Sequence, residues 1–157
     1  MLAHELAALY TRDLTRLVQE LSAFPDTATV WQTRAGITNS AGNLALHLEG
    51  NLREYIGRQL GQIAYARQRP LEFSARDVSQ SELMTRLEAV RDTIPGVISR
   101  LSDSQLEAKY PEAIHGKSIT TRQFLIHLLA HLSYHLGQVD YLRRFLTGNG
   151  AIDLAAL

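Results

Sequence analysis

Between residues 83 and 101 the sequence places apolar side chains alternately four and three positions apart, and this pattern limits the fold more than any other feature. The residues are Leu83, Leu87, Val90, Ile94, Val97 and Leu101. Such spacing predicts a helix whose apolar seam packs against other helices in a bundle. Ser79 and Glu82 form a capping box before it. Pro95 lies inside the seam, yet the apolar register continues beyond it, so we expect a kink in this helix rather than its end.

Three other segments have apolar residues at helical intervals. They are residues 2–22, 40–64 and about 120–146. Asn39 or Ser40 can cap the second segment, and Thr120 with Gln123 forms a capping box for the last. No stretch of useful length alternates with period two. Four amphipathic helices without strands predict an all-α four-helix bundle with a kinked third helix.

The segments between these patterns are interpreted as loops. Phe24-Pro25-Asp26 opens the first, which contains Trp31, and Arg69-Pro70 marks the second. The third, residues 102–120, is longer and polar, and we expect it to fold over one end of the bundle. At 157 residues, without an internal repeat, the chain is expected to form a single domain over residues 1–157.

Charge and cysteine content exclude several classes of protein. Sixteen Lys and Arg residues balance sixteen Asp and Glu residues, with no basic arm or stripe, so no nucleic-acid partner is expected. The chain has no cysteine, which leaves histidines and carboxylates as its strong metal ligands. It shows neither a secretory leader pattern nor an apolar stretch of roughly eighteen residues. We therefore expect a soluble, cytoplasmic protein with no membrane partner.

The segment FLIHLLAHLSYHLGQ, residues 124–138, carries three histidines spaced four residues apart: His127, His131 and His135. Helical rotation places His135 nearest the apolar seam and His127 farthest from it. A histidine pair at positions i and i+4 can reach one metal ion beside the helix, so His131 and His135 are candidate ligands. His127 and His135 are about 12 Å apart along the helix axis, so we do not expect one ion to bind all three.

A third ligand is expected from a facing helix, and His47, on the flank of the second apolar stripe, is the candidate. Asn43 and Asn51 lie one turn to either side of it, where they could orient His47 or a bound water. His4 and His115 lie near the start of the chain and in a loop, and neither is expected to be a ligand. Spacing alone leaves packed or solvent-facing histidines as an equal alternative.

Two further polar residues are associated with the histidine run. Tyr134 and Gln138 lie on the same side of the last helix as His127 and His131. They could line a pocket beside the site, or they could pack against neighbouring residues.

Two stretches resemble the DinB-like, or damage-inducible, superfamily of four-helix-bundle metalloproteins. They are NSAGNLALHLEGNLREYI at 39–56 and TTRQFLIHLLAHLSYHLGQVDYLRRFLTG at 120–148, and the motif H-x-x-x-H-x-x-x-H-x-G-Q in the second is the more specific. The rest of the chain matches the family only by pattern. The resemblance implies a divalent metal, zinc or nickel with iron or manganese as alternatives, held by His47, His131 and His135. His127 matches the leading histidine of the motif, which is not generally a ligand in that family.

The resemblance identifies a site better than it identifies a reaction. Some relatives are thiol-dependent S-transferases that use bacillithiol or mycothiol, others are thiol-dependent isomerases, and many have no assigned activity. A metal-dependent S-transferase acting with a low-molecular-weight thiol is the leading hypothesis, and a metal-dependent hydrolase is an alternative. The hydrolase is the weaker of the two, because Glu49 and Glu54 cannot be placed as a general base from the sequence. A non-enzymatic metal or ligand binder and a structural dimer remain open as well.

The last helix has little polar surface. Phe124, Tyr134, Tyr141 and Phe145 form an aromatic strip beside its aliphatic seam. A helix that is apolar on most sides is expected to pack on both of them or to pair with another chain. We therefore expect a homodimer.

Overall fold

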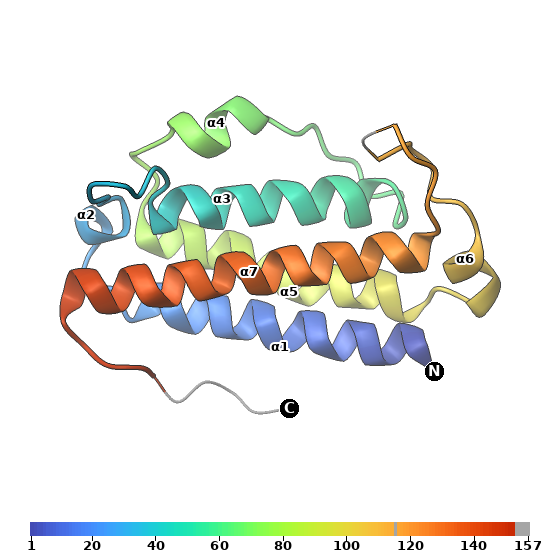
Figure 1. Cartoon of the computed structure of the whole chain (residues 1–157), viewed down its shortest axis with the longest axis horizontal. Coiled ribbons are helices and arrows are strands. Elements are labelled where there is room, and N and C mark those ends of the chain that lie inside the picture. The colour runs from blue at the N-terminus through green and yellow to red at the C-terminus, as the bar shows by residue number, and fades with distance from the viewer. Residues whose placement is uncertain (115, 153–157) are drawn as a thin grey trace.

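Four long helical segments lie side by side in the computed structural model, which describes residues 1–114 and 116–152 (Figure 1). They are α1 (Leu2–Ser22), α3 (Ala41–Leu52) with its continuation η1 (Arg53–Arg58), α5 (Gln80–Ser99) and α7 (Thr121–Thr147). Three short helices connect them: α2 (Thr27–Val30), α4 (Arg69–Ser74) and α6 (Asp103–Glu107). Both α1 and α3 pack against α5 and α7. The predicted all-α class is confirmed, and in the described part of the chain extended pairing is limited to two isolated bridges.

Side-chain caps determine where the long helices begin. The Ser40 hydroxyl accepts the Asn43 backbone N–H at 3.1 Å, and the Asn43 side chain in turn accepts from the Ser40 backbone. The Ser79 and Thr120 hydroxyls likewise accept the backbone N–H groups of Glu82 and Gln123, but the reciprocal side-chain bond of the predicted capping boxes is not among the described bonds of α5 and α7. Ser40 is therefore the cap of the second long helix rather than Asn39. At the other end of α7, Gly148 takes the left-handed conformation, with φ of 71°, and stops the helix.

The apolar seam predicted for the third long helix lies in the core. Five of its six side chains, from Leu83 to Val97, are at most 3% exposed, and Leu101 is partly buried. The helix runs through Pro95 without interruption, as the continuous seam indicated. That Pro95 also bends the helix stays a prediction.

The second long helix is shorter than its apolar pattern indicates. It was expected to reach residue 64, but regular α-helix ends at Leu52, a π-helical stretch follows to Arg58, and Gln62 has φ of 53°, outside any right-handed helix. Ile63 is 38% exposed, so its position in the apolar pattern does not reflect a buried helix face. Apolar residues in a turn continued the periodicity by coincidence.

The segment after this helix is not the simple loop expected from Arg69-Pro70. Pro70 instead stands in the first turn of α4, where its missing backbone N–H removes no helical hydrogen bond. This segment passes over the outer side of α3 (Figure 1). As a result all twelve residues of α3 are buried. The polar residues of α3 must therefore find partners inside the protein.

The described parts of the polar segment, residues 102–114 and 116–120, lie at one end of the bundle, as expected (Figure 1). Leu106 and Tyr110 anchor it in the core, and the Tyr110 hydroxyl donates to the Tyr55 carbonyl at 2.7 Å. The short helix α6 within it, like α2, was not expected from the sequence. None of the helices in the described residues is long and apolar enough to cross a membrane.

A buried ion pair joins α7 to α1. Arg143 is 1% exposed and Glu20 is fully buried, and the Arg143 guanidinium donates to the Glu20 carboxylate. A second guanidinium nitrogen donates to the Gly150 carbonyl at 3.1 Å.

The Arg143→Met substitution is expected to lower the free energy of unfolding by about 3–5 kcal/mol, because it leaves the Glu20 carboxylate buried without its partner. Urea denaturation followed by circular dichroism measures the change. The double variant Glu20→Leu/Arg143→Met should recover most of the loss, since no buried charge remains. Equal stability of the single variant and the wild type would show that the pair is not needed to satisfy Glu20.

Candidate metal centre

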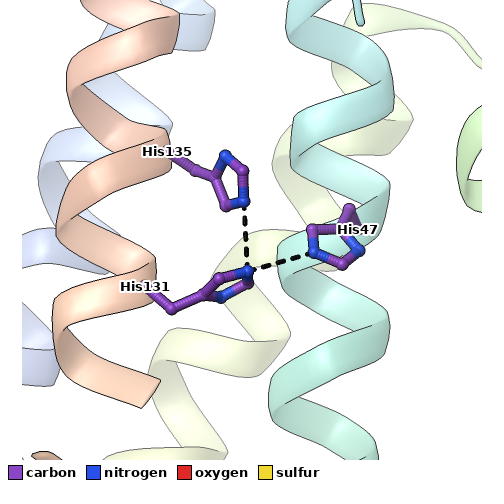
Figure 2. A group of neighbouring side chains, drawn as sticks. All are labelled: His47, His131 and His135. Carbon is purple, nitrogen blue, oxygen red and sulfur yellow. Dashed lines mark hydrogen bonds between the residues drawn. The ribbon is translucent and has the colours of Figure 1, made fainter. Parts of the chain in front are cut away.

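Three histidine rings from two helices point toward one another in the middle of the bundle (Figure 2). His47 comes from α3, and His131 and His135 come from successive turns of α7. The Nε2 atom of His131 is 3.2 Å from Nε2 of His47 and 3.1 Å from Nε2 of His135. These ligand atoms all lie within 4.8 Å of one another. The structure thus brings together the three residues that the sequence indicated.

The two distances from Nε2 of His131 fit two ligands of one divalent metal ion, and the third pair of ligand atoms lies within 4.8 Å. Histidine nitrogens bind zinc at about 2.0–2.1 Å, so two ligands of a tetrahedral ion lie about 3.3 Å apart, and adjacent ligands of an octahedral ion lie about 3.0 Å apart. The two Nε2 distances, 3.1 and 3.2 Å, fall between these values. The cluster can therefore hold an ion, and its geometry leaves the kind of metal open.

Burial keeps the rings in the form that binds metal. Together with smaller contributions from the neighbouring His135 and His47, burial lowers the pKa of His131 to about 4. Burial also lowers the pKa of His135. Both rings are therefore neutral near pH 7, with a nitrogen lone pair available.

Glu72 orients the His47 ring. Its Oε2 accepts the His47 Nδ1–H at 2.9 Å, which leaves Nε2 of His47 free to bind an ion. Arg67 donates to both oxygens of the same carboxylate, at 2.7 and 2.9 Å. Burial alone would raise the pKa of Glu72, but the hydrogen bonds from His47 and Arg67 hold it below its usual value. Glu72 is therefore a charged acceptor that fixes both the orientation and the tautomer of His47.

Gln138 has the same role for His135. Its Oε1 accepts the His135 Nδ1–H at 2.6 Å and leaves Nε2 facing the other two rings. Tyr134 is exposed and packs edge-on against His135, with ring centroids 5.3 Å apart. Both residues contact His135, but neither lines the cavity formed by His47 and His131. Nδ1 of His131, by contrast, is buried and has no hydrogen-bond partner among the described residues.

The two asparagines beside His47 take different places. Asn43 donates to the backbone carbonyls of Glu72 and Ala75, at 2.9 and 3.4 Å, and none of its hydrogen bonds goes to His47. It therefore anchors α4, and with it Glu72. The side-chain amide of Asn51 makes no hydrogen bond in the described structure, and the residue lines a cavity beside the site.

The remaining candidates lie away from the three Nε2 atoms. His127 is exposed, lies beside the Phe124 ring and lines the same cavity as Asn51. His4 is exposed on α1, and His115 lies outside the described residues. Glu49 pairs with Arg53 and Arg86, and Glu54 pairs with Arg58, so neither carboxylate is available as a general base at the site.

Sequence reasoning missed Glu72 and Arg67. Both lie in a segment interpreted as a loop, 20 or more residues after His47, and no spacing links them to it. Gly50, one turn after His47, also matters, because a Cβ atom at this position would collide with the Glu72 carboxylate. A glycine therefore lets Glu72 approach α3 closely enough to reach His47.

A cavity of about 370 Å³ opens beside the centre. His47 and His131 form part of its wall together with Asn51, Arg67, Arg69 and Phe124. A small molecule in this cavity would touch two of the three histidines, so the centre is accessible to a ligand.

Comparison with known proteins agrees with this fold. A sequence model of the DinB superfamily matches residues 9–139. The crystal structure of a DinB-like protein from Bacillus cereus ATCC 10987 superposes with a TM-score of 0.70, covering 94% of this chain and 95% of that one. The two sequences are 16% identical, so the likeness concerns the fold alone. No curated protein matches the sequence.

Substitution of a histidine of the cluster should remove the metal. After growth in metal-supplemented medium, the wild type is expected to contain about one divalent ion per chain, and His47→Ala and His131→Ala should contain almost none, because two ligands hold an ion far more weakly than three. Elemental analysis of the purified proteins measures the content. His127→Ala is the matched control, since His127 lies one turn away on the same helix, and it should keep its ion. Unchanged metal content in both cluster variants would contradict the assignment.

Weakening the support of His47 should weaken metal binding without removing a ligand. Glu72→Gln and Gly50→Ala are each expected to lower zinc affinity about 10- to 100-fold, the first by removing the charged acceptor and the second by displacing it. Competition with a chromophoric chelator measures the affinity. Gly96→Ala is the matched control, because a Cβ atom there meets nothing within 4 Å. Wild-type affinity in both Glu72→Gln and Gly50→Ala would show that His47 does not need this support.

Proposed function

This chain belongs to the DinB superfamily, and we propose that it is a metal-dependent enzyme of that family in which His47, His131 and His135 hold one divalent ion. We propose a thiol S-transferase, which joins a low-molecular-weight thiol to an electrophilic substrate. Zinc or nickel is the ion proposed, because imidazole ligands suit both, and iron or manganese are the alternatives. The proposed location is the cytoplasm, where small thiols stay reduced.

The observation that carries the proposal is a three-nitrogen centre with a cavity at its side. A structural metal site is normally closed by four protein ligands, whereas a catalytic site keeps a position open for water or substrate. Here three histidine nitrogens converge, and two of the rings also face the cavity. In the described residues no cysteine, aspartate or glutamate joins the group as a fourth ligand. This arrangement supports a reactive site over a purely structural one.

Each residue of the centre has a definite part in this proposal. Glu72 and Gln138 accept the Nδ1 protons of His47 and His135, so the Nε2 atoms face the ion without adding charge. A divalent ion held by neutral imidazoles keeps its full charge and would favour the thiolate form of a small-molecule thiol near pH 7. The chain itself has no cysteine, so the thiol must come from a second molecule.

The surroundings of the centre support the transferase over the hydrolase. Zinc hydrolases that bind the ion through a helical histidine pair use a glutamate as the general base for the attacking water. In the described part of the chain no aspartate or glutamate lines the cavity, and Glu72 is already bound by His47 and Arg67. A thiolate nucleophile needs no such base. A non-enzymatic binder would hold the same ligands as the transferase but would not convert them to product. The following experiment measures this conversion.

A thiol-transfer screen tests the proposal. Zinc- and nickel-loaded protein is assayed with bacillithiol, mycothiol and glutathione against 1-chloro-2,4-dinitrobenzene, with product formation followed by absorbance. Turnover with at least one thiol is expected, and it should fall at least about 100-fold in His135→Ala, because loss of a ligand removes the ion that activates the thiol. His127→Ala again serves as the matched control for ion binding. Thiol binding without turnover would favour the binder.

We also propose that the protein is a homodimer that pairs through α7. Tyr134, Tyr141 and Phe145 are exposed on one side of this helix, at 65, 72 and 68%. The exposed small residues Ala130, one turn before Tyr134, and Gly137, one turn before Tyr141, lie on the same side, where a second helix could approach closely. Aromatic side chains left this exposed on one helix are typical of a protein interface.

Tyr141→Glu should convert the dimer into a monomer, because it places a charge in the centre of this apolar face. Sedimentation equilibrium of the wild type should give twice the chain mass, and the variant should give the single mass. Leu71→Glu is the control, since Leu71 is an equally apolar residue that is 56% exposed on α4. A monomeric wild type would rule out the dimer.

A further inference from the structure

The cavity beside the metal centre has a definite charge character. It is lined by His47 and His131, by the polar residues Asn51, Arg67 and Arg69, and by an apolar wall that includes Phe124. In the described part of the chain it has two arginines and no carboxylate on its lining. A cavity of this size, about 370 Å³, suits a small ligand, and the charge of Arg69, which no carboxylate of the described residues compensates, favours an anionic one.

Asn51 is the polar residue that the fold leaves without a partner. It is 7% exposed, its Oδ1 atom is fully buried, and neither atom of its amide makes a hydrogen bond in the described structure. Buried amides are nearly always hydrogen-bonded, because leaving one unpaired costs about 1–3 kcal/mol. The other polar residues of α3 satisfy this rule through Glu72, Arg53 and Arg86. Asn51 lines the cavity, and its Nδ2 atom, which makes no hydrogen bond and is not sealed as Oδ1 is, is the donor that a ligand there can meet.

The two arginines of the cavity differ in availability. Arg67 donates two of its nitrogens to Glu72 and so belongs to the support of His47. Arg69 makes no ion pair with any residue that the structure describes. Its guanidinium lies over the Phe73 ring, 5.3 Å from the centroid, and Phe73 packs against His47. A ring beneath an arginine holds the planar group in place and leaves its edge free for a bidentate partner.

We propose that this cavity binds a small organic carboxylate, with its carboxylate on Arg69 and Asn51 and its apolar or aromatic body against Phe124. Carboxylate geometry matches the planar edge of an arginine, and an asparagine amide can donate to the second oxygen. A molecule held there also touches His47 and His131, so the carboxylate group would position a reacting atom beside the ion. This inference rests on the proposed function only where it calls the carboxylate a substrate. Binding of the carboxylate in the cavity does not depend on thiol transfer.

Binding of 3-phenylpropionate and of its neutral analogue 3-phenylpropionamide tests the proposal. Both are titrated into zinc-loaded protein and followed by protein-observed NMR at the Asn51 side-chain amide and the Arg69 Nε–H. The acid is expected to bind at least about fivefold more tightly than the amide, because a partly exposed charge-assisted hydrogen bond separates them. The resonances of Asn51 and Arg69 should shift with the acid.

The Arg69→Gln variant tests whether Arg69 binds the carboxylate, and Arg100→Gln is its control. Arg100 is an exposed arginine at the end of α5 that does not line the cavity. The preference for the acid should fall to within about twofold in Arg69→Gln and stay unchanged in Arg100→Gln. No preference in the wild type, or an unchanged preference in Arg69→Gln, would overturn the proposal. A preference that survives in Arg69→Gln but disappears when zinc is removed would place the carboxylate on the ion, which also contradicts it.

The Asn51→Leu variant distinguishes a role of Asn51 in ligand binding from a role in the stability of the fold. Leucine has a similar volume and leaves no unpaired amide, so the melting temperature should stay the same or rise. Affinity for 3-phenylpropionate should nevertheless fall about threefold or more, through loss of a hydrogen bond to the carboxylate. A lower melting temperature with unchanged affinity would show that Asn51 serves the fold and not the ligand. None of these measurements uses thiol transfer. The carboxylate-binding proposal and the S-transferase proposal can therefore fail separately.

Discussion

The hydrogen bond between His47 and Glu72 joins the two parts of this structure that the metal centre needs. One is the helical bundle, which brings α3 and α7 together. The other is the segment that crosses the outside of α3 and carries Glu72. Arg67 holds the carboxylate from the same segment, and Gly50 leaves the room for it. Because this crossing segment covers the outer side of α3 and the bundle covers the rest, each polar residue of the helix must be paired within the protein or by a ligand.

Polar residues of α3 consequently divide into two groups. Asn43 and Glu49 are satisfied by the scaffold, the first through the backbone of α4 and the second through Arg53 and Arg86. His47 and Asn51 face the interior beside α7, where the scaffold supplies Glu72 to one side of His47 and nothing to Asn51. Unpaired buried groups cost stability, so their retention on one helix face indicates a site that a ligand completes.

Prediction of the helices succeeded where a long periodic pattern and a cap agreed. The seam of α5 and the caps Ser79 and Thr120 are examples, since packing and local hydrogen bonding there favour the same structure. It failed for short or irregular elements. The π-helical end of the second long helix, the helix α4 around Pro70 and the short helices α2 and α6 are too brief to show periodicity, and contacts with the bundle stabilise them. At the candidate site, the pair His131 and His135 was visible as a local spacing, whereas His47 required both an assumed bundle and a family resemblance.

The amino-acid sequence by itself determined the four long helices, the all-α class and the histidine pair on α7, because these depend on residues within a few turns of one another. Only the tertiary structure decided that Glu72 and Arg67 support His47, that Gln138 orients His135, and that Asn51 and Arg69 share a cavity with the histidines. Most of these contacts join α3 to a segment without a periodic pattern. The path of that segment follows from burying α3, which is a property of the packed bundle and not of any local stretch of sequence.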